Sequence, residues 1–487
     1  ERGADPNITN NRGRSPLHEA LSTEAAELLI RHGAEVNKPD VAKKAPLFVA
    51  TERDSRDVIK VLLSNRADPN SIAKRGRSPL HEARSGEAAE ILIKYKAKIN
   101  ARTSSGETPL LLATKEDRKP VIQVLLDKGA DAKIPGPFKR FPIHEVQSPE
   151  AAMSLIGKTV NINEGDENGE TPLFVAVKAN RRDVADVLLV KGAADPNISN
   201  SDEQSPLHQA QSEEMVDLLI KYQAEVNVRD VQGETPLFAA SRLGRVSVLK
   251  KLLLNKGDPD VRDYSLQTPL LVASQNGHLC VVQVLLENGV NPNIPDDSLR
   301  TPLFVAKSAE TAKLLVKKGA NVNCIDKKGE TALHSFCRGG REDVAKQLLS
   351  EGARCDIKNK KQQTAFVIAI SKGYLRIASQ FLASILNSAE SRLEQEFEIL
   401  SEIGEGGYGK VYKVKKKTDG EEYALKCVTI SGDSEKMQRS LREVRAAMQL
   451  GGAFIVRCYD AWIEEGHVDE KVIKSQTEPV VGDKTPK

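Results

Sequence analysis

Apolar positions follow a two-part helical pattern over most of the chain. Residues 169–196 hold a clear copy of it. Leu173 and Ala176 give an apolar face to a first short helix, and Val184 and Leu188 fall at helical spacing in a second one. One such pair of short helices cannot bury its own apolar surface, so it must stack on a further copy of itself.

The ends of these two helices also carry local signals. Thr171 can cap the first helix, because its hydroxyl can accept a hydrogen bond from a backbone N–H that the first turn leaves unpaired. Pro172 suits the first helical position, where its missing N–H costs nothing. Gly192 follows the second helix, and we expect it to take the left-handed conformation that commonly ends a helix.

The same helix-start signal recurs at a nearly fixed interval. It stands at residues 15, 45, 78, 108, 141, 171, 205, 235, 268, 301, 331 and 364. The intervals are 30, 33 or 34 residues, and a fixed period of this length is typical of a solenoid. We therefore predict one repeat array over residues 1–386, with a partial copy at 1–14. Residues 2–7 read like the end of a repeat, so we expect the natural protein to continue upstream.

Short copies follow the starts at 15, 78, 141, 205 and 301, where three residues are missing between the two helices. The short form places a serine directly before its second helix, and that hydroxyl can act as the cap. The serines are Ser22, Ser85, Ser148 and Ser212. Short and long copies largely alternate up to about residue 268, which makes a pair of about 63 residues the working unit.

The consensus sequence of the copies, T/S-P-L-H/F-x-A followed by L-L-x-x-G-A-x-x-N, resembles the ankyrin repeat. The resemblance implies a mainly α fold: a solenoid of about 12–13 helix pairs joined by hairpin-like loops, with a concave face. It also implies protein partners that bind the loop tips and the concave face. The histidines at the fourth place of the start motif are expected to be structural hydrogen-bonding groups. They are His18, His81, His144, His208 and His334.

Composition narrows the cellular context. The formal net charge is +3, so no global field favours nucleic acid or a membrane surface. No apolar run approaches the roughly 18 residues of a spanning helix, and no membrane association is expected. The six cysteines have no framework spacing and no metal-ligand pattern. These features predict reduced thiols, no metal site, and a location in the cytoplasm or the nucleus.

Basic residues gather in the loops before the first three starts: Arg12, Arg14, Lys43, Lys44, Lys74, Arg75 and Arg77. In a stacked array these loops lie side by side, so the residues could form a stripe that binds an acidic protein segment or a polyanion. Solvated loop charge is the alternative interpretation. The loop at 134–141 offers two further candidates, Phe138 and Phe141, either for contact with a partner or for packing on the next helix.

The period disappears after residues 387–396, which read as a linker. Residues 397–403 alternate in the manner of a strand. A glycine-rich turn follows, with Gly404, Gly406 and Gly409, and then a second strand that contains Val411. A third short strand carries Ala424 and Lys426, and a helix over residues 434–450 carries Glu443. The order and the spacing of these signals make them specific as a set.

This set resembles the N-lobe of a protein kinase, a small α+β unit with an antiparallel sheet and one helix, here at 397–464. The resemblance implies ATP as the cofactor. The residues it assigns to the nucleotide are Ile403, Gly404, Gly406, Gly409, Val411, Ala424, Lys426 and Glu443. Residues 455–464 are similar to a strand of the kinases that phosphorylate the alpha subunit of translation initiation factor two. Residues 465–487 read as a polar tail or the start of the insert found in those kinases.

The sequence contains no H-R-D-x-x-x-x-N and no D-F-G motif. The catalytic base and the Mg²⁺ ligands of a kinase are therefore absent, we assign no catalytic residue to this chain, and we expect no phosphoryl transfer by it alone. The favoured interpretation is a piece of a serine/threonine kinase with a repeat scaffold, which would use Mg²⁺ only with a complete kinase domain. A purely non-catalytic scaffold is one alternative. The other is part of a protein built like ribonuclease L, whose repeats bind an oligonucleotide effector.

Overall fold

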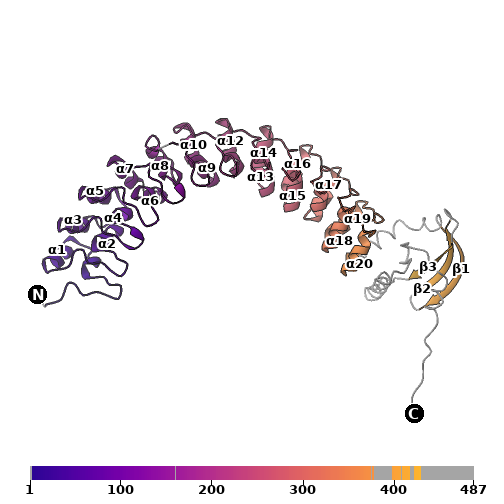
Figure 1. Ribbon diagram of the computed structural model, residues 1–487, viewed down its shortest axis with the longest axis horizontal. Helices are drawn as coiled ribbons and strands as arrows, with labels where there is room; N and C mark the ends of the chain where they lie inside the picture. The colour runs from indigo at the N-terminus through magenta and orange to yellow at the C-terminus, as the bar shows by residue number, and fades with distance from the viewer. Residues whose placement is uncertain are drawn as a thin grey trace, which may run out of the picture. The chain divides into compact units, whose positions relative to one another are not determined.

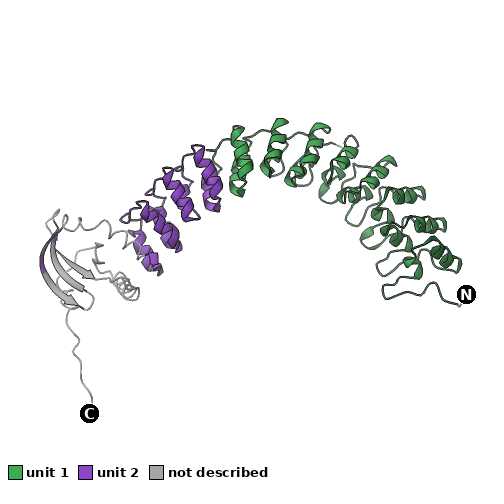
Figure 2. Ribbon diagram, turned by 180° about the vertical axis from the view of Figure 1, so that it is seen from behind, with its two compact units in different colours: residues 1–263 green, residues 264–487 purple. Residues whose placement is uncertain are grey.

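The structure is a computed structural model that describes residues 3–159, 161–374, 376–377, 397–406, 409–416 and 422–428. It divides into two compact units, residues 1–263 and residues 264–487 (Figure 2). The described part is mainly helical, with strands only near its C-terminal end, as the sequence predicts (Figure 1).

The first unit consists of stacked helix pairs. The first helices of its copies are η1 (Pro16–Glu19), α2 (Pro46–Glu52), α4 (Pro79–Glu82), α6 (Pro109–Lys115), η4 (Pro142–His144), α9 (Pro172–Lys178), α11 (Pro206–Gln209) and α13 (Pro236–Leu243). Two loops hold short 3-10 turns, η2 (Lys74–Gly76) and η3 (Pro137–Lys139). The second helices are α1 (Thr23–Arg31), α3 (Arg56–Ser64), α5 (Gly86–Lys94), α7 (Lys119–Asp127), α8 (Pro149–Leu155), α10 (Arg182–Val190), α12 (Glu213–Lys221) and α14 (Val246–Leu254).

The second unit continues the same design and adds a sheet. Its helices are α15 (Pro269–Asn276), α16 (Leu279–Glu287), η5 (Pro302–Val305), α17 (Ala309–Lys317), α18 (Ala332–Gly339), α19 (Glu342–Ser350) and α20 (Ala365–Lys372). Its strands are β1 (Phe397–Gly406), β2 (Gly409–Lys416) and β3 (Glu422–Val428). They form an antiparallel sheet in the order β1-β2-β3.

The core lies between successive copies. First helices pack on first helices, as α2 does on α4, and second helices pack on second helices, as α3 does on α5. In most copies the residue two positions after the cap is a leucine buried in this stack, for example Leu47 and Leu173, both 0% exposed. Burying one such side chain contributes roughly 1.5–3 kcal/mol, so the stacking of neighbours is the main source of stability.

The caps are confirmed, but one of the predicted helix ends is wrong. Thr171 accepts a hydrogen bond from the amide of Phe174, and Ser85 accepts one from Ala88. Gly192 does not adopt positive φ; the left-handed residue is Ala193, with φ 52°. A Cβ on Gly192 would lie 2.6 Å from the carbonyl oxygen of Leu188. Gly192 is therefore required by close packing of the backbone and not by handedness.

The structural role predicted for the histidines is confirmed. In the 205 copy, the Nδ1 atom of His208 accepts a hydrogen bond from the backbone amide of Ser205, at 3.1 Å. Its Nε2 atom lies 3.1 Å from the carbonyl oxygen of Glu234, which belongs to the next copy. The remaining start-motif histidines make the same pair of contacts: His18, His81, His144 and His334. Each ring therefore joins its own helix cap to the following repeat.

An arginine occupies the space beside each short copy. In the short copies the first helix ends after about one turn, which leaves carbonyl groups without helical partners. An arginine of the following long copy donates to these carbonyls, as Arg245 does to Ala210 at 2.8 Å. The other four are Arg53 to His18, Arg118 to Ala83, Arg181 to Val146 and Arg341 to Lys307. The long copies at 268 and 364 follow other long copies and carry His278 and Tyr374 at the position of Arg245.

Mild acid should destabilise the array through its buried histidines. Burial lowers the pKa of His144 and of His208 to about 4, although the carboxylates of Asp166 and Asp230 oppose this shift. Their contribution to stability is therefore complete above pH ~6.5, the ordinary histidine pKa, and is lost as the pH falls toward ~4. It amounts to up to roughly 3 kcal/mol for each group. Urea midpoints measured across this range should fall with pH. They should fall less steeply for His208→Gln than for the exposed control His32→Gln, and equal slopes would contradict the assignment.

Removing an interlocking arginine should cost more than removing a surface arginine. Burial lowers the pKa of Arg245, and its guanidinium bonds a carbonyl that has no helical partner. We expect Arg245→Ala to reduce the free energy of unfolding by about 1–3 kcal/mol, in chemical denaturation followed by far-ultraviolet circular dichroism. Arg182→Ala, at an exposed position with 53% of the side chain accessible, should change it by less than about 0.5 kcal/mol. Equal losses for the two variants would show that Arg245 has no special role.

Candidate functional site

A four-residue turn projects before each helix start, and we call these turns tips. Tips 1–8 of the first unit are residues 10–13, 40–43, 73–76, 103–106, 136–139, 166–169, 200–203 and 230–233. In tip 2 the amide of Asp40 donates to the carbonyl of Lys44, and the amide of Lys43 donates back to Asp40. The last residue of each tip has positive φ, as at Gly13 and Lys43. The chain therefore reverses within four residues and presents the two central ones outward.

Backbone hydrogen bonds join neighbouring tips into a ladder. The amide of Val41 donates to the carbonyl of Arg12 at 3.1 Å, and the amide of Lys74 donates to Ala42 at 3.0 Å. The amide of Ser104 then donates to Arg75 at 2.8 Å. These bonds place the first four tips side by side, so the loops that carry the predicted basic residues do adjoin one another.

The structure divides the seven predicted basic residues into two groups. Arg14, Lys44 and Arg77 directly follow the tips and are half-buried in ion pairs within the array. Arg12, Lys43, Lys74 and Arg75 lie in the tips themselves and are exposed. None of these four has an ion pair within the described residues. Only the second group is available to a partner.

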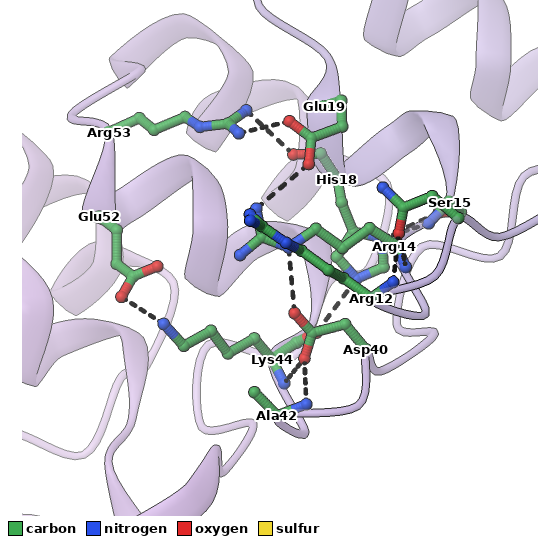
Figure 3. A network of polar contacts seen from close by, with 11 residues as sticks. Arg12, Arg14, Ser15, His18, Glu19, Asp40, Ala42, Lys44, Glu52 and Arg53 are labelled. Atoms are coloured by element: carbon green, nitrogen blue, oxygen red, sulfur yellow. Dashed lines mark hydrogen bonds and ion pairs between the residues drawn. The ribbon is translucent and has the colours of Figure 1, made fainter.

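The network around Arg14 shows why the first group is structural (Figure 3). Its guanidinium contacts Glu19 and Asp40, at 3.1 Å from each carboxylate. Burial alone would raise the pKa of Asp40, but the amides of Lys44 and Ala42 and the Arg14 guanidinium together lower it. Arg53 from the next copy reaches the same Glu19. These charges hold the tip against the helices behind it and leave little of Arg14 for a ligand.

The same position carries a charged residue in most copies of the array. In short copies the residue before the cap forms an ion pair with the residue five positions later, as Arg77 does with Glu82 at 2.7 Å. In long copies its ion-pair partner is the residue eight positions later, as for Lys44 with Glu52 at 2.6 Å and for Glu170 with Lys178 at 2.5 Å. A charged residue at this position is therefore part of the repeat architecture, whatever its sign.

Other exposed tip residues were not singled out from the sequence. Tips 6 and 7 carry exposed carboxylates at Glu167, Asp202 and Glu203. In the second unit, two adjacent tips carry exposed lysines, and the amide of Lys360 donates to Lys328 at 3.0 Å. Those lysines are Lys327, Lys328, Lys360 and Lys361. The signal was present, because all these residues lie within the four-residue turns before the helix starts, as Arg12 and Lys43 do.

The two aromatic candidates of the loop at 134–141 have different roles. Phe141 is 7% exposed, at the cap position, and its ring stacks on His144 with the centroids 5.8 Å apart. Phe138 is 68% exposed within tip 5. Packing on the next helix thus describes Phe141, whereas Phe138 is available for contact.

The sheet arranges the predicted nucleotide residues in order. Gly406 lies opposite Gly409 where β1 meets β2. Gly404 lies opposite Val411, and Val411 lies opposite Lys426, so these three positions form one row across the strands. Ile403 lies in β1 and Ala424 in β3, opposite Lys413. Glu443, the helix expected at 434–450 and the stretch at 455–464 lie outside the described residues.

Within the described residues, no three His, Cys, Asp or Glu side chains are grouped so that they could hold a metal ion. None of the described helices is long and apolar enough to cross a membrane. Cys280, Cys324, Cys337 and Cys355 are free thiols, and burial raises the pKa of Cys337.

A solenoid of short helix pairs with hydrogen-bonded tips defines a class of repeat protein, and comparison with known proteins identifies the repeat. Ankyrin repeats (three copies) match residues 2–73, 65–135, 192–263, 209–296, 237–326 and 303–390, and a single ankyrin repeat matches 168–201. The chain belongs to the ankyrin-repeat proteins. Residues 397–473 match the protein kinase domain, so a partial kinase domain follows the array.

Individual relatives match either part. Transient receptor potential cation channel subfamily A member 1 from Homo sapiens is 27% identical over 53% of this chain and 29% of its own length. Eukaryotic translation initiation factor 2-alpha kinase 1 from Rattus norvegicus is 44% identical over 17% of this chain and 14% of its own length. The crystal structure of the Bcl-3 ankyrin domain is 30% identical, covers 44% of this chain and 99% of its own, and has a TM-score of 0.39. The chain spans less than a third of the length of these two curated relatives.

The division of the basic residues can be tested in one repeat. We expect Arg14→Ala to lower the free energy of unfolding by about 1–3 kcal/mol, because it leaves the buried Asp40 carboxylate without its guanidinium partner. Arg12→Ala, two residues away and exposed, should change it by less than about 0.5 kcal/mol. Chemical denaturation of the two variants gives the comparison. A cost for Arg12→Ala as large as that for Arg14→Ala would place both residues in the structural network.

Proposed function

We propose that the chain is a cytoplasmic protein-binding scaffold joined to the nucleotide-binding lobe of a serine/threonine kinase. The observation that carries the proposal is the match of residues 397–473 to the protein kinase domain, directly after an ankyrin array that matches to residue 390. Ankyrin arrays are protein-interaction modules. In this proposal the array recruits a protein, and the kinase domain of the whole protein acts on it.

The nucleotide role of the sheet is supported by its backbone. Glycines stand at positions 404, 406 and 409, around the end of the β1–β2 hairpin, and glycine lets a backbone approach phosphate oxygens closely. In this proposal Gly404, Gly406 and Gly409 cover the phosphates of ATP, and Ile403, Val411 and Ala424 contact the adenine side. Lys426 binds the α- and β-phosphates, and Glu443 orients Lys426.

The translation factor kinases give the proposal its substrate class. Eukaryotic translation initiation factor 2-alpha kinase 1 is 44% identical over 84 residues, and eIF-2-alpha kinase GCN2 from Schizosaccharomyces pombe is 40% identical over 90 residues. We propose that the whole protein phosphorylates a translation factor of this kind. Protein kinase domains use ATP, generally with Mg²⁺, but this chain carries neither motif that holds the metal.

The array contributes through its tips and its concave face. The four exposed cations of tips 1–3 have no carboxylate partner in the described part of the first unit, so an acidic protein segment is the ligand that fits them. A polyanion would meet the same charges without using the apolar side chains between them. Val41 and Ile72, each 64% exposed, lie among these cations and suit a protein segment better.

Nucleotide binding by the whole chain tests the kinase part. We expect a fluorescent ATP analogue to bind residues 1–487 saturably in an anisotropy titration, and Lys426→Ala to weaken binding at least about tenfold, since a phosphate contact is lost. Lys415→Ala, an exposed lysine of the neighbouring strand, should change affinity less than about twofold. Equal binding by all three proteins would exclude the assigned role of Lys426, and no binding by any of them would exclude the nucleotide site in this chain.

A further inference from the structure

The tips of the first unit form an edge whose charge is divided into segments. Tips 1–3 carry Arg12, Lys43, Lys74 and Arg75, whereas tips 6 and 7 carry Glu167, Asp202 and Glu203. All seven side chains are exposed, and none has an ion pair within the described residues. One edge therefore presents four unneutralised cations at one end and three unneutralised anions further along.

The two segments are separated at a break in the backbone ladder. Tips 1–4 are joined by hydrogen bonds, and tips 5–8 are joined by the bonds Glu167 to Phe138 at 2.9 Å, Ser201 to Asn168 at 2.8 Å and Val231 to Asp202 at 3.0 Å. In the other tips the amide of the second residue donates to the preceding tip. In tip 5 this residue is Pro137, which has no N–H, so no such bond joins tips 4 and 5. Arg102 bridges this place by donating to the carbonyl of Pro135, at 2.9 Å.

The centre of the edge carries an exposed aromatic side chain and no unpaired charge, because Lys139 of tip 5 forms an ion pair with Glu164 at 2.7 Å. Phe138 follows the break and is 68% exposed, and tip 4 offers only Ser104 and Ser105. A large exposed aromatic between two charged segments is the arrangement expected at the middle of a protein interface, where aromatic residues are enriched and charges are depleted.

We propose that the partner of this edge is the same edge of a second copy of the chain, in antiparallel orientation. A two-fold axis between tips 4 and 5 places tip 3 of one copy opposite tip 6 of the other, and tip 2 opposite tip 7. Each basic segment then meets an acidic segment, twice in the dimer, because a two-fold interface is self-complementary. Phe138 of each copy lies close to the axis and loses its contact with water.

The sequence of charges favours this partner over others. A nucleic acid or another polyanion would be attracted by tips 1–3 but repelled by tips 6 and 7 of the same edge. In addition, none of tips 1–3 carries an aromatic side chain on which a base could stack. This inference rests on the proposed use of the tips as a protein-binding edge, and it assigns the acidic segment to the chain itself.

Charge exchange on the full chain tests the proposal. The acidic variant carries Lys43→Glu, Lys74→Glu and Arg75→Glu, and the basic variant carries Glu167→Lys, Asp202→Lys and Glu203→Lys. In sedimentation equilibrium at about 50 mM salt we expect the unaltered chain to dimerise, and each variant alone to dimerise at least about tenfold more weakly. An equimolar mixture of the two variants should recover the dimer. In the mixed dimer, tips 1–3 of each variant face tips 6 and 7 of the other, and the facing segments have opposite charge. About 500 mM salt should weaken every dimer.

A control variant changes net charge by the same amount and in the same direction as the acidic variant, but away from the edge: Lys60→Glu, Arg182→Glu and Lys250→Glu on the exposed sides of α3, α10 and α14. It should dimerise like the unaltered chain. The proposal is overturned if the unaltered chain stays monomeric at about 100 µM and low salt, or if either charge variant dimerises as well as the control. The nucleotide titration is independent of these results, so a monomeric chain that still binds the ATP analogue through Lys426 would leave the kinase assignment standing.

Discussion

Each copy of the repeat depends on the next copy to satisfy its backbone. In five copies the cap of the first helix is completed by a histidine whose other ring nitrogen contacts the following loop, as His208 contacts the carbonyl of Glu234. The tips in turn share amide-to-carbonyl bonds from one copy to the next. Buried or half-buried polar groups without partners cost free energy comparable to a lost hydrogen bond. The stack is therefore specified by polar groups as well as by the buried leucines.

The alternation of short and long copies follows from the same constraint. Deleting three residues between the helices leaves carbonyl groups that no helical amide can reach, and an arginine of the following long copy bonds them. The two changes only work together: a short copy needs the arginine, and a long copy that follows another long copy has no such use for it. His278 and Tyr374 stand where those long copies would otherwise carry the arginine. The unit of about 63 residues is thus a physical unit as well as a sequence period.

The helix caps were predicted correctly from the sequence, whereas the end of one helix and the arginine contacts between copies were not. The capping by Thr171 and Ser85 depends on residues three apart, so it could be predicted from neighbours in the chain. The role of Gly192 was predicted wrongly, because the close carbonyl of Leu188 and not the handedness of the helix end decides it. The interlocking role of Arg245 joins residues 35 apart and has no local signature.

The basic residues also show that the contacts of a side chain could not be predicted from the sequence, and here the contacts decide which residues can bind a partner. Arg12 and Arg14 look alike in the sequence, yet one is an exposed tip residue and the other is tied to Asp40 and Glu19. The difference lies in their register: the residue before a cap faces the helices, and the central residues of a tip face outward. Once register is known, the tip residues along residues 10–233 can be compared as one series, and that series is not uniformly basic. Its charge reverses across a ladder break at Pro137. A partner that covered only the basic end would leave Phe138 and the anions exposed, so the whole edge, and not the cluster of cations, is the surface whose binding has to be explained.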